Sequence, residues 1–389
     1  MNTKKILVTN GRYPITLDLI RNLAHGKHEI YLAETQWINL SRFSNAVKKS
    51  FIVPSPRFNP KEHISKLLEI VTKEKIDLFI PMWEDIFIVS KYAHEFPKSC
   101  KLFCSDFQLL DRIHNKWSFY SLMEEIGIKA PKTSLITSKK DLENIIIDSY
   151  ALKACYSRAS QHVHRITNNQ QIPDISPTET HPWMAQEWLD GDNYCSYSIC
   201  NNGKVHAHVT YPVDFVIKNK TSLVKNVGSY CISFRVSQHD AILKWVENFA
   251  KATNFTGQVG FDFIELDNKE IYAIECNPRI TGGVSLFTPN NRIDNAFFAK
   301  NSEIIQPPID ERTQITMGNL LYGWRQAASC NKLDIFFSNL FYAKDITFSF
   351  KDIKPFLAQP LIFAKYISDG IRFKKPLPAA FTHDLDYNG

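Results

Sequence analysis

The chain has 389 residues, 44% apolar and 22% charged, which is ample material for a folded core and excludes a disordered chain. The 46 Lys and Arg residues against 40 Asp and Glu give a net charge of +6, too mild to indicate a nucleic acid or membrane partner. Eight cysteines are too few for a disulfide scaffold in a chain of this length, and the absence of a C-x-x-C pair disfavours a zinc ribbon or thioredoxin-type site. No signal peptide or spanning segment is recognisable, so we expect a soluble, cytoplasmic protein of roughly two or three domains.

The first hundred residues alternate between strand-like and helix-like patterns. Short apolar runs predict strands at 5–9, 29–33, 51–53 and 76–81, and apolar residues at helical spacing predict helices at 15–24 and 64–73. This βαβ rhythm predicts a parallel, Rossmann-like sheet. The first turn, Asn10-Gly11-Arg12, has one glycine where a dinucleotide site has G-x-G-x-x-G, so a dinucleotide-dependent oxidoreductase is the weakest interpretation.

The remainder of the chain mixes both patterns. We expect helices at 106–113, 117–126 and 242–252, a loop at 168–181, and strands at 151–154, 205–210, 224–234, 258–266 and 270–275. The last two strands flank an Asp267-Asn268 turn and should pair antiparallel. Beyond residue 301 the sequence is aromatic and mostly helical, which indicates packing on the preceding domain or an oligomer contact. Residues 384–386 are expected to be an exposed tail.

The most informative stretch is the predicted strand pair around Asp262 and Glu275. The two carboxylates can face each other across the pair, and Asn277 follows on the same face. Carboxylate and amide oxygens suit Mg²⁺, with Mn²⁺ as an alternative, and Arg279 adds a cation nearby. The alternative interpretation is a solvated strand face with ordinary charges.

Two further stretches carry candidate groups. Lys153 lies inside an apolar strand, which is uncommon unless it faces an anion, and the Ser- and Arg-containing turn after it could cover a phosphate. An exposed edge-strand lysine is the alternative. The run 184–192 is an apolar, aromatic strand that ends in acidic residues and a glycine, as a hinge would.

In this order the three stretches resemble the ATP-grasp superfamily, in particular carbamoyl-phosphate synthase and biotin carboxylase-like ligases with a pre-ATP-grasp domain. The resemblance rests on Lys116, Lys153, a small-residue loop, a Q-E-x-L-x-G hinge, an aspartate on one strand and E-x-N-P-R on the next, and it covers roughly residues 4 to 300. It implies a Rossmann-like pre-ATP-grasp domain at 1–112, an ATP-grasp domain at 113–310 with a lid-bearing part (113–185) and a metal-binding part (186–310), and a helical C-terminal extension at 311–389.

The resemblance also implies roles for individual residues. Catalysis would rest on Lys153 and Arg279, the latter stabilising the transferring phosphoryl group or an acyl phosphate. Mg²⁺ would be held by Asp262, Glu275 and Asn277. ATP would be bound by Lys116, Lys153, Ser157, Arg158, Ser160, Gln186, Glu187, Trp188, Leu189, Asp192 and Asn193.

Two departures from the family pattern affect these roles. The phosphate loop has no glycine, since Ala159 stands between Arg158 and Ser160. The position that often carries a ribose-binding acid is Asn193, with Asp192 beside it, so the ribose contact is left open.

The function that follows is an ATP-dependent ligase that joins a small carboxylate to an amine through an acyl phosphate. Two alternatives stay open: a non-catalytic ATP-binding regulatory module of the same fold, and a carboxylase or kinase that acts on bicarbonate. We expect small-molecule substrates without a nucleic acid or membrane partner, and a homodimer is also left open.

Other candidates are two histidine pairs and one acidic pair. His162 with His164 and His206 with His208 could face one side of a strand as zinc would need, but the sequence offers no third ligand. Glu84-Asp85 follows a predicted strand end, where ligands of parallel sheets bind; the alternative is an acidic pair that begins a helix.

Overall fold

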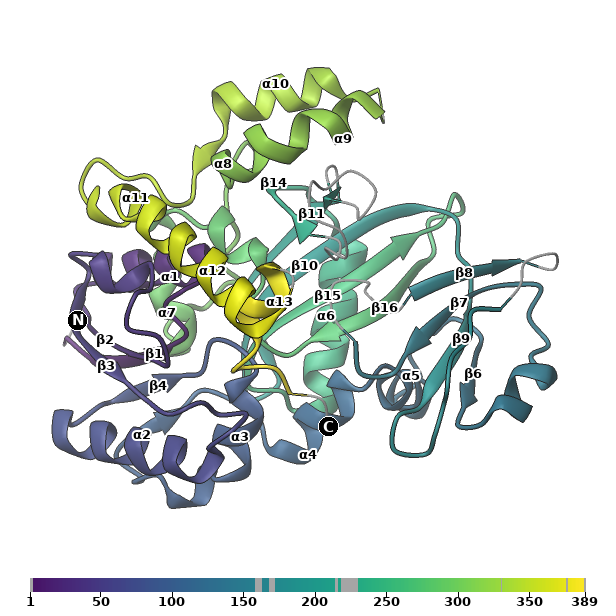
Figure 1. Ribbon diagram of the computed structural model, residues 1–389, viewed down its shortest axis with the longest axis horizontal. Coiled ribbons are helices and arrows are strands. Elements are labelled where there is room, and N and C mark those ends of the chain that lie inside the picture. Colours follow the sequence, from purple (N-terminus) through teal and green to yellow (C-terminus); the bar gives the residue numbers. More distant parts are fainter. Residues whose placement is uncertain are drawn as a thin grey trace.

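The computed structural model describes residues 3–157, 163–167, 172–213, 216–217, 230–329, 331–375 and 377–387. A parallel sheet, antiparallel sheets and helices share these residues, which confirms the mixed α/β and α+β class (Figure 1). No helix in the described part is long and apolar enough to cross a membrane.

The N-terminal part is the predicted parallel sheet. Its strand order is β3-β2-β1-β4-β5, and its elements are β1 (Lys5–Thr9), α1 (Pro14–His25), β2 (Glu29–Glu34), β3 (Val47–Ile52), α2 (Pro60–Glu74), β4 (Leu78–Ile80), α3 (Asp85–Lys91) and β5 (Lys101–Leu102). The prediction placed the third strand at 51–53. In the structure β3 begins at Val47. The sequence does not reveal this start, because the exposed lysines of this edge strand interrupt its apolar pattern.

An antiparallel sheet of order β11-β10-β15-β16 forms the centre of the molecule. Its strands are β10 (Asp192–Asn201), β11 (Lys204–Pro212), β15 (Gly257–Glu265) and β16 (Ile271–Asn277). Helix α6 (Asp240–Thr253) packs Trp245 and Phe249 against Phe261 and Phe263, which alternate along β15. The opposite face of β15 is thereby left for the polar side chains that lie between them in the sequence.

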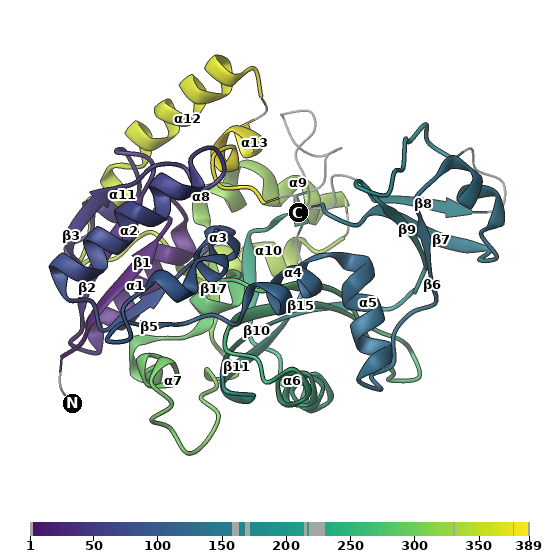
Figure 2. The ribbon, with the colours of Figure 1, turned by 90° about the horizontal axis from the view of Figure 1, so that it is seen from below.

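A second antiparallel sheet, of order β6-β9-β7-β8, lies beside the first. Helices α4 (Phe107–His114) and α5 (Lys116–Glu125) lead into its strands β6 (Thr133–Ile136), β7 (Ser149–Ala154), β8 (Val163–Thr167) and β9 (Trp183–Glu187). Figure 2 shows α5 between the two sheets. The described part of the predicted 168–181 loop, from residue 172, is irregular.

Short strands and helices make up the rest of the chain. The strands are β12 (Val216–Ile217), which pairs with β13 (Tyr230–Cys231), and β14 (Ser233–Arg235), β17 (Arg312–Gln314) and β18 (Lys344–Asp345), which form one sheet. The helices are α7 (Asp294–Phe297), α8 (Thr316–Gly318), α9 (Trp324–Ser329), α10 (Leu333–Tyr342), α11 (Lys354–Leu357), α12 (Gln359–Phe373) and α13 (Leu377–Thr382). Of the predicted strand at 224–234, residues 224–229 lie outside the described residues.

The prediction of an exposed tail at 384–386 is wrong. Leu385 is buried, and Asp384 forms an ion pair with the guanidinium of Arg12 at 2.7 Å. Arg12 is itself fully buried and also contacts Glu34 at 2.5 Å. The segment resembles a tail in the sequence because its acidic residues are short and polar, and the buried partner of Asp384 lies 372 residues away.

We predict that Arg12→Met destabilises the protein by about 3–5 kcal/mol, because the change leaves buried carboxylates without their cation. Arg57→Met is the matched control, since Arg57 is partly exposed and lies 3.8 Å from Asp386, and it should change stability by less than about 1 kcal/mol. Urea unfolding followed by circular dichroism measures both. Equal midpoints for the two variants would contradict a structural role for the buried guanidinium.

Candidate active site

Asp262 of β15 and Glu275 of β16 face each other in the observed register, as the sequence predicts. Burial and, to a smaller extent, the negative charge of Glu275 raise the pKa of Asp262 to about 6. The thiol of Cys195 donates a hydrogen bond to Asp262 Oδ1 at 3.2 Å and opposes this shift. The side chain between Glu275 and Asn277, Cys276, is buried in the opposite, apolar face.

Lys116 brings the first cation to this carboxylate pair. Its ammonium lies 3.5 Å from Glu275 Oε1 and donates to the backbone carbonyl of Ser157 at 2.8 Å. Lys116 is the first residue of α5, whose N-terminus is capped by the side chain of Asn115. Its backbone N–H donates to Cys155 O at 3.1 Å, so the start of the helix is also tied to the end of β7.

Lys153 of β7 brings the second cation. Its side chain is buried and donates to the amide oxygen of Gln186, in the neighbouring strand β9, at 2.9 Å. Gln186 in turn donates to Thr133 at 3.2 Å. Burial lowers the pKa of Lys153, the negative charge of Glu275 opposes this, and the resulting pKa is about 8. The side chain of Gln186 therefore orients Lys153.

Arg279 lies at the far end of β16, against the parallel-sheet domain. Its guanidinium covers the ring of Trp83 at 3.8 Å from the centroid and lies 3.8 Å from Glu84 Oε1. It donates to the amide oxygen of Asn277 at 3.2 Å. Trp83 also stacks on Tyr13, with ring centroids 4.1 Å apart. Arg279 is thus fixed between two domains, and 13% of its side chain is exposed.

The predicted hinge residues lie at the end of β9, in the connection that follows it and at the start of β10. Glu187 accepts a hydrogen bond from the backbone of Lys132 at 2.8 Å, and Trp188 donates to Asp190 at 2.8 Å. Leu189 is half-buried, whereas Asp192 and Asn193 are exposed.

Gly191 allows this connection to approach β15 closely. A Cβ at this position would lie 2.2 Å from the backbone oxygen of Glu265, which is too close for any side chain. The glycine of the hinge is therefore required by close packing of two backbone segments.

The phosphate loop is described only at its beginning. Ser157 is buried, its hydroxyl donates to Ala154 O at 3.1 Å, and its carbonyl accepts from Lys116. The predicted residues Arg158 and Ser160 lie outside the described residues.

The C-terminal segment reaches the same region from the other side. The backbone N–H of Tyr387 donates to Glu84 Oε2 at 2.8 Å, and its hydroxyl donates to Asp111 of α4 at 3.1 Å. The Tyr387 ring stacks on Phe87, with centroids 4.4 Å apart. A cavity of about 300 Å³ lies here, lined by Pro56, Arg57, Pro60, Glu84, Ile88, Leu385, Asp386 and Tyr387.

The remaining candidate ligands have structural partners. No group of three or more His, Cys, Asp or Glu among the described residues could hold a metal ion. His208 is buried between Ser198 and Thr210, which lowers its pKa to about 3, and His162 lies outside the described residues. Asp85 accepts from Asn10 at 2.6 Å within the parallel-sheet domain. Glu84, the other residue of the predicted acidic pair, lies near Arg279.

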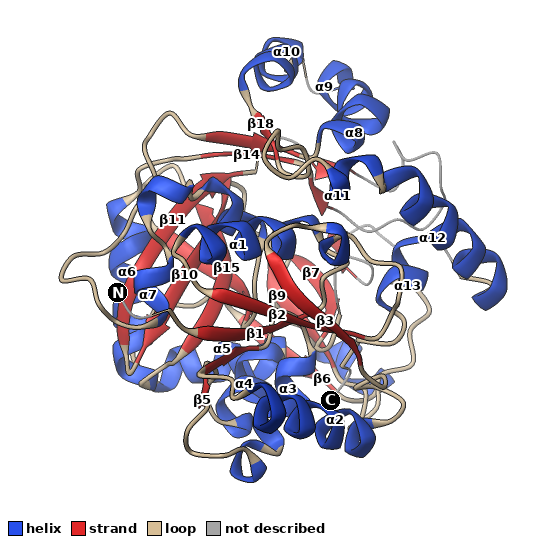
Figure 3. Cartoon of the chain, turned by 90° about the vertical axis from the view of Figure 1, so that its left-hand side faces the viewer, coloured by secondary structure: helices blue, strands red, loops and turns tan. Residues whose placement is uncertain are grey.

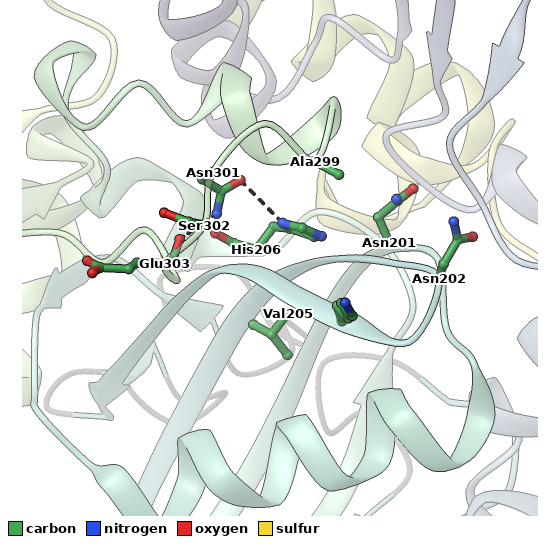
Figure 4. Close-up of a pocket in the computed structure, with 9 residues that line it drawn as sticks. Asn201, Asn202, Val205, His206, Ala299, Asn301, Ser302 and Glu303 are labelled. Atoms are coloured by element: carbon green, nitrogen blue, oxygen red, sulfur yellow. Dashed lines mark hydrogen bonds between the residues drawn. The ribbon is translucent and has the colours of Figure 1, made fainter.

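A second cavity is separate from these residues. It has a volume of about 480 Å³ and lies at the turn between β10 and β11 (Figure 4). There His206 bonds to Asn301 at 3.2 Å, so one half of a predicted histidine pair is bonded to an amide side chain.

Lys153 of one antiparallel sheet and Lys116 of α5 thus lie near the facing carboxylates of the other sheet. Residues 113–283 match the family model of the ATP-grasp domain. An uncharacterised protein of Methanocaldococcus jannaschii is 22% identical over 175 residues, which cover 44% of this chain and 42% of that protein. The match thus spans less than half the length of this relative.

Solved structures of the same fold cover most of the chain. The L-amino acid ligase of Bacillus licheniformis is similar with a TM-score of 0.61 at 14% identity, over 81% of this chain and 80% of its own. The N5-carboxyaminoimidazole synthetase of Staphylococcus aureus, solved with ADP, has a TM-score of 0.61 at 11% identity, over 80% and 82%. The biotin carboxylase domain of the Hydrogenobacter thermophilus 2-oxoglutarate carboxylase has a TM-score of 0.55 at 12% identity, over 78% and 71%. These likenesses establish a common fold.

Several neighbours of the site were missed by sequence reasoning. Trp83, beneath Arg279, and Cys195, beside Asp262, belong to elements far away in the sequence. Trp83 directly precedes the acidic pair after β4, so its position at a strand end was the available signal. No sequence pattern pointed to Cys195.

We predict that the apparent Kd for ATP rises about tenfold between pH 7 and pH 9, because Lys153 must regain its proton to meet a phosphate and its pKa is about 8. Isothermal titration across this range measures the effect. Lys153→Met should bind more weakly throughout and lack this pH dependence. Parallel pH profiles for the two proteins would contradict the assignment.

Proposed function

We propose that this protein is an ATP-dependent ligase that activates a small carboxylate as an acyl phosphate and passes it to an amine. One observation carries the proposal: Lys116 lies 3.5 Å from Glu275, the charges of Glu275 and Asp262 act on the buried Lys153, and Arg279 follows two residues after the end of β16. Phosphoryl transfer needs positioning and positive charge more than covalent help from the protein. These residues supply both.

The two cations and the two carboxylates have separate roles in binding ATP. The ammonium groups of Lys116 and Lys153 neutralise phosphate charge, and the buried position of Lys153 strengthens its attraction. The backbone between Glu187 and Leu189 would meet the adenine, with Trp188 beside it, and Ser157 would lie at the phosphates. Asp192 and Asn193 are the exposed candidates for the ribose.

A divalent cation fits the facing carboxylates. Asp262 and Glu275, with the amide oxygen of Asn277, are hard oxygen donors, and burial together with the repulsion from Glu275 raises the pKa of Asp262. Mg²⁺ held there would neutralise both carboxylates and supply Lewis-acid polarisation of phosphate oxygens. Mn²⁺ has the same ligand preference.

Arg279 would receive the second reactant. Its guanidinium is fixed by Trp83, Glu84 and Asn277, so a carboxylate can bind without first ordering a flexible side chain. The carboxylate oxygen attacks the γ-phosphorus, ADP leaves, and the amine then attacks the acyl carbon and releases phosphate. The amide oxygen of Asn277 holds the guanidinium toward the facing carboxylates during both steps.

Bicarbonate is the second candidate acceptor of the phosphoryl group. The biotin carboxylase domain of similar fold was solved with bicarbonate, and a fixed arginine suits that anion equally well. Bicarbonate alone would then stimulate ADP release, whereas a ligase needs a carboxylate together with an amine. Measuring ADP release with each supplement separates the two.

We predict that Glu275→Gln lowers ADP release at least about a hundredfold, because the metal site loses a charge while the side chain keeps its shape. Glu270→Gln is the matched control: it lies in the turn before β16, pairs with Lys129 on the surface and should leave turnover unchanged. A coupled assay for ADP, with amino acids and small carboxylates screened as substrates, measures both. Failure of the wild-type protein to bind ATP with Mg²⁺ would overturn the proposed function, and unchanged turnover in Glu275→Gln would overturn the metal assignment.

A further inference from the structure

Exposed apolar side chains are concentrated in the C-terminal part of the chain. Of the 21 large apolar side chains that are exposed among the described residues, 17 lie between residues 309 and 373. Scattered exposed apolar residues need no explanation, but a contiguous patch marks an interaction site. We call the exposed side chains of α9 to α12 and their connections the C-terminal apolar face; Trp324, Phe341, Tyr342, Phe350, Leu357 and Ile371 represent it.

Two helices of this face are apolar on both sides. Helix α12 buries Ile362 and Tyr366 against the parallel-sheet domain, so its inner side is already satisfied. Its outer side nevertheless carries Leu361 and Ile367, which are 51% and 41% exposed, and Ile371, which is 74% exposed. An amphipathic surface helix of a globular protein has polar residues there.

Helix α10 repeats this arrangement. It buries Phe336 but exposes Phe337 at 51% and Phe341 at 75%, and Tyr342 beside them is 81% exposed. Core packing therefore accounts for only one side of each helix.

The charges that surround this face are mostly positive. Arg325, Lys332, Lys351, Arg372 and Lys374 form no ion pair with the described residues, and Arg372 covers the ring of the exposed Phe373. Asp334 is the exposed acid of α10.

The other acids of the segment are engaged inside the fold or with a lysine. Asp345 accepts hydrogen bonds around the start of α8, Asp352 pairs with Arg21, and Asp369 pairs with Lys365. The mild net charge of the whole chain therefore conceals a local excess of cations, which is why the sequence did not predict this surface.

The helices of this face form two groups, α9 with α10 and α11 with α12. Figure 1 shows α9 and α10 at the top, above α11 and α12, and Figure 3 shows the two groups following one another from the top of the molecule down its right-hand side. An extended surface could contact both groups at once.

Charge decides between the possible occupants. In a symmetric pair of copies the same cations would oppose one another, and like charges at an interface are unfavourable. An anionic lipid surface complements them, while exposed aromatic and aliphatic side chains enter the boundary between headgroups and acyl chains. We propose that the C-terminal apolar face binds peripherally to an anionic membrane surface.

Co-sedimentation with vesicles tests this proposal on the full chain. Wild-type protein should bind vesicles of phosphatidylglycerol and phosphatidylcholine, bind those of phosphatidylcholine alone more weakly, and lose affinity as salt rises. Lys351→Gln/Arg372→Gln should weaken binding to the anionic vesicles about 30-fold, from about fivefold for each cation. Phe341→Ser/Tyr342→Ser/Ile371→Ser should weaken it at least as much. These side chains are exposed, so the folded state should survive, as circular dichroism will verify.

Matched controls change the same residue types elsewhere. Ile146→Ser/Phe58→Ser and Lys61→Gln/Lys98→Gln alter exposed side chains outside the face and should leave binding unchanged. Absence of binding to anionic vesicles, or equal loss in the controls, would overturn the proposal. Light scattering measures the oligomeric state. If the wild-type protein is a dimer and the triple variant is a monomer, the face binds a second copy and the membrane assignment is overturned. ADP release is a separate readout, so failure here leaves the proposed ligase function untouched.

Discussion

A guanidinium with almost no exposed surface joins the beginning of the chain to its end. Arg12 contacts Glu34 at the end of β2, the carbonyl of Phe381 and the carboxylate of Asp384. A buried cation is tolerated only when its donors are matched, so all three segments must hold their places together. From Asp384 the chain continues to Tyr387, which contacts Glu84 and α4. The C-terminal segment thus links Arg12 to Glu84, which lies 3.8 Å from Arg279.

The candidate site also places buried charges beside opposite charges, but there the charges are available to a ligand. Burial alone would drive Lys153 and Asp262 toward their neutral forms, and the pKa values of both shift in that direction. Each opposite charge nearby opposes the shift, so the groups remain responsive to a bound ion. Arg12 is instead surrounded by fixed partners. The Arg12 cluster therefore stabilises the fold, whereas the charged groups of the candidate site can exchange their present partners for the charges of a ligand.

The central elements were predictable because their signals are local. The strand pair that carries Asp262 and Glu275 has alternating apolar residues and a turn between its strands, and the observed register agrees with the prediction. The βαβ rhythm of the first hundred residues likewise predicted a parallel sheet, which the structure confirms. The predicted start of edge strand β3 was wrong, because its exposed lysines do not alternate with core residues.

The contacts that could not be predicted join residues distant in sequence. The Gln186 side chain was assigned to the nucleotide hinge, yet it bonds to Lys153 because β7 and β9 are neighbours. Trp83 reaches Arg279 only through the packing of two domains. Asp384 looked like solvent-exposed sequence, since nothing near it reveals a buried arginine 372 positions earlier. Periodicity reports which face is apolar, and it carries no information about partners across the fold.

The long separation between Arg12 and Asp384 has a consequence for biosynthesis. Ribosomes deliver the parallel-sheet domain first, and its central arginine then has one carboxylate partner in place of two. Closure of so long a loop is entropically slow, so this domain must wait for the last helices before its interior is electrically balanced. During that interval the nascent domain is less stable than the finished one, and chaperones that recognise incomplete domains would find their substrate there.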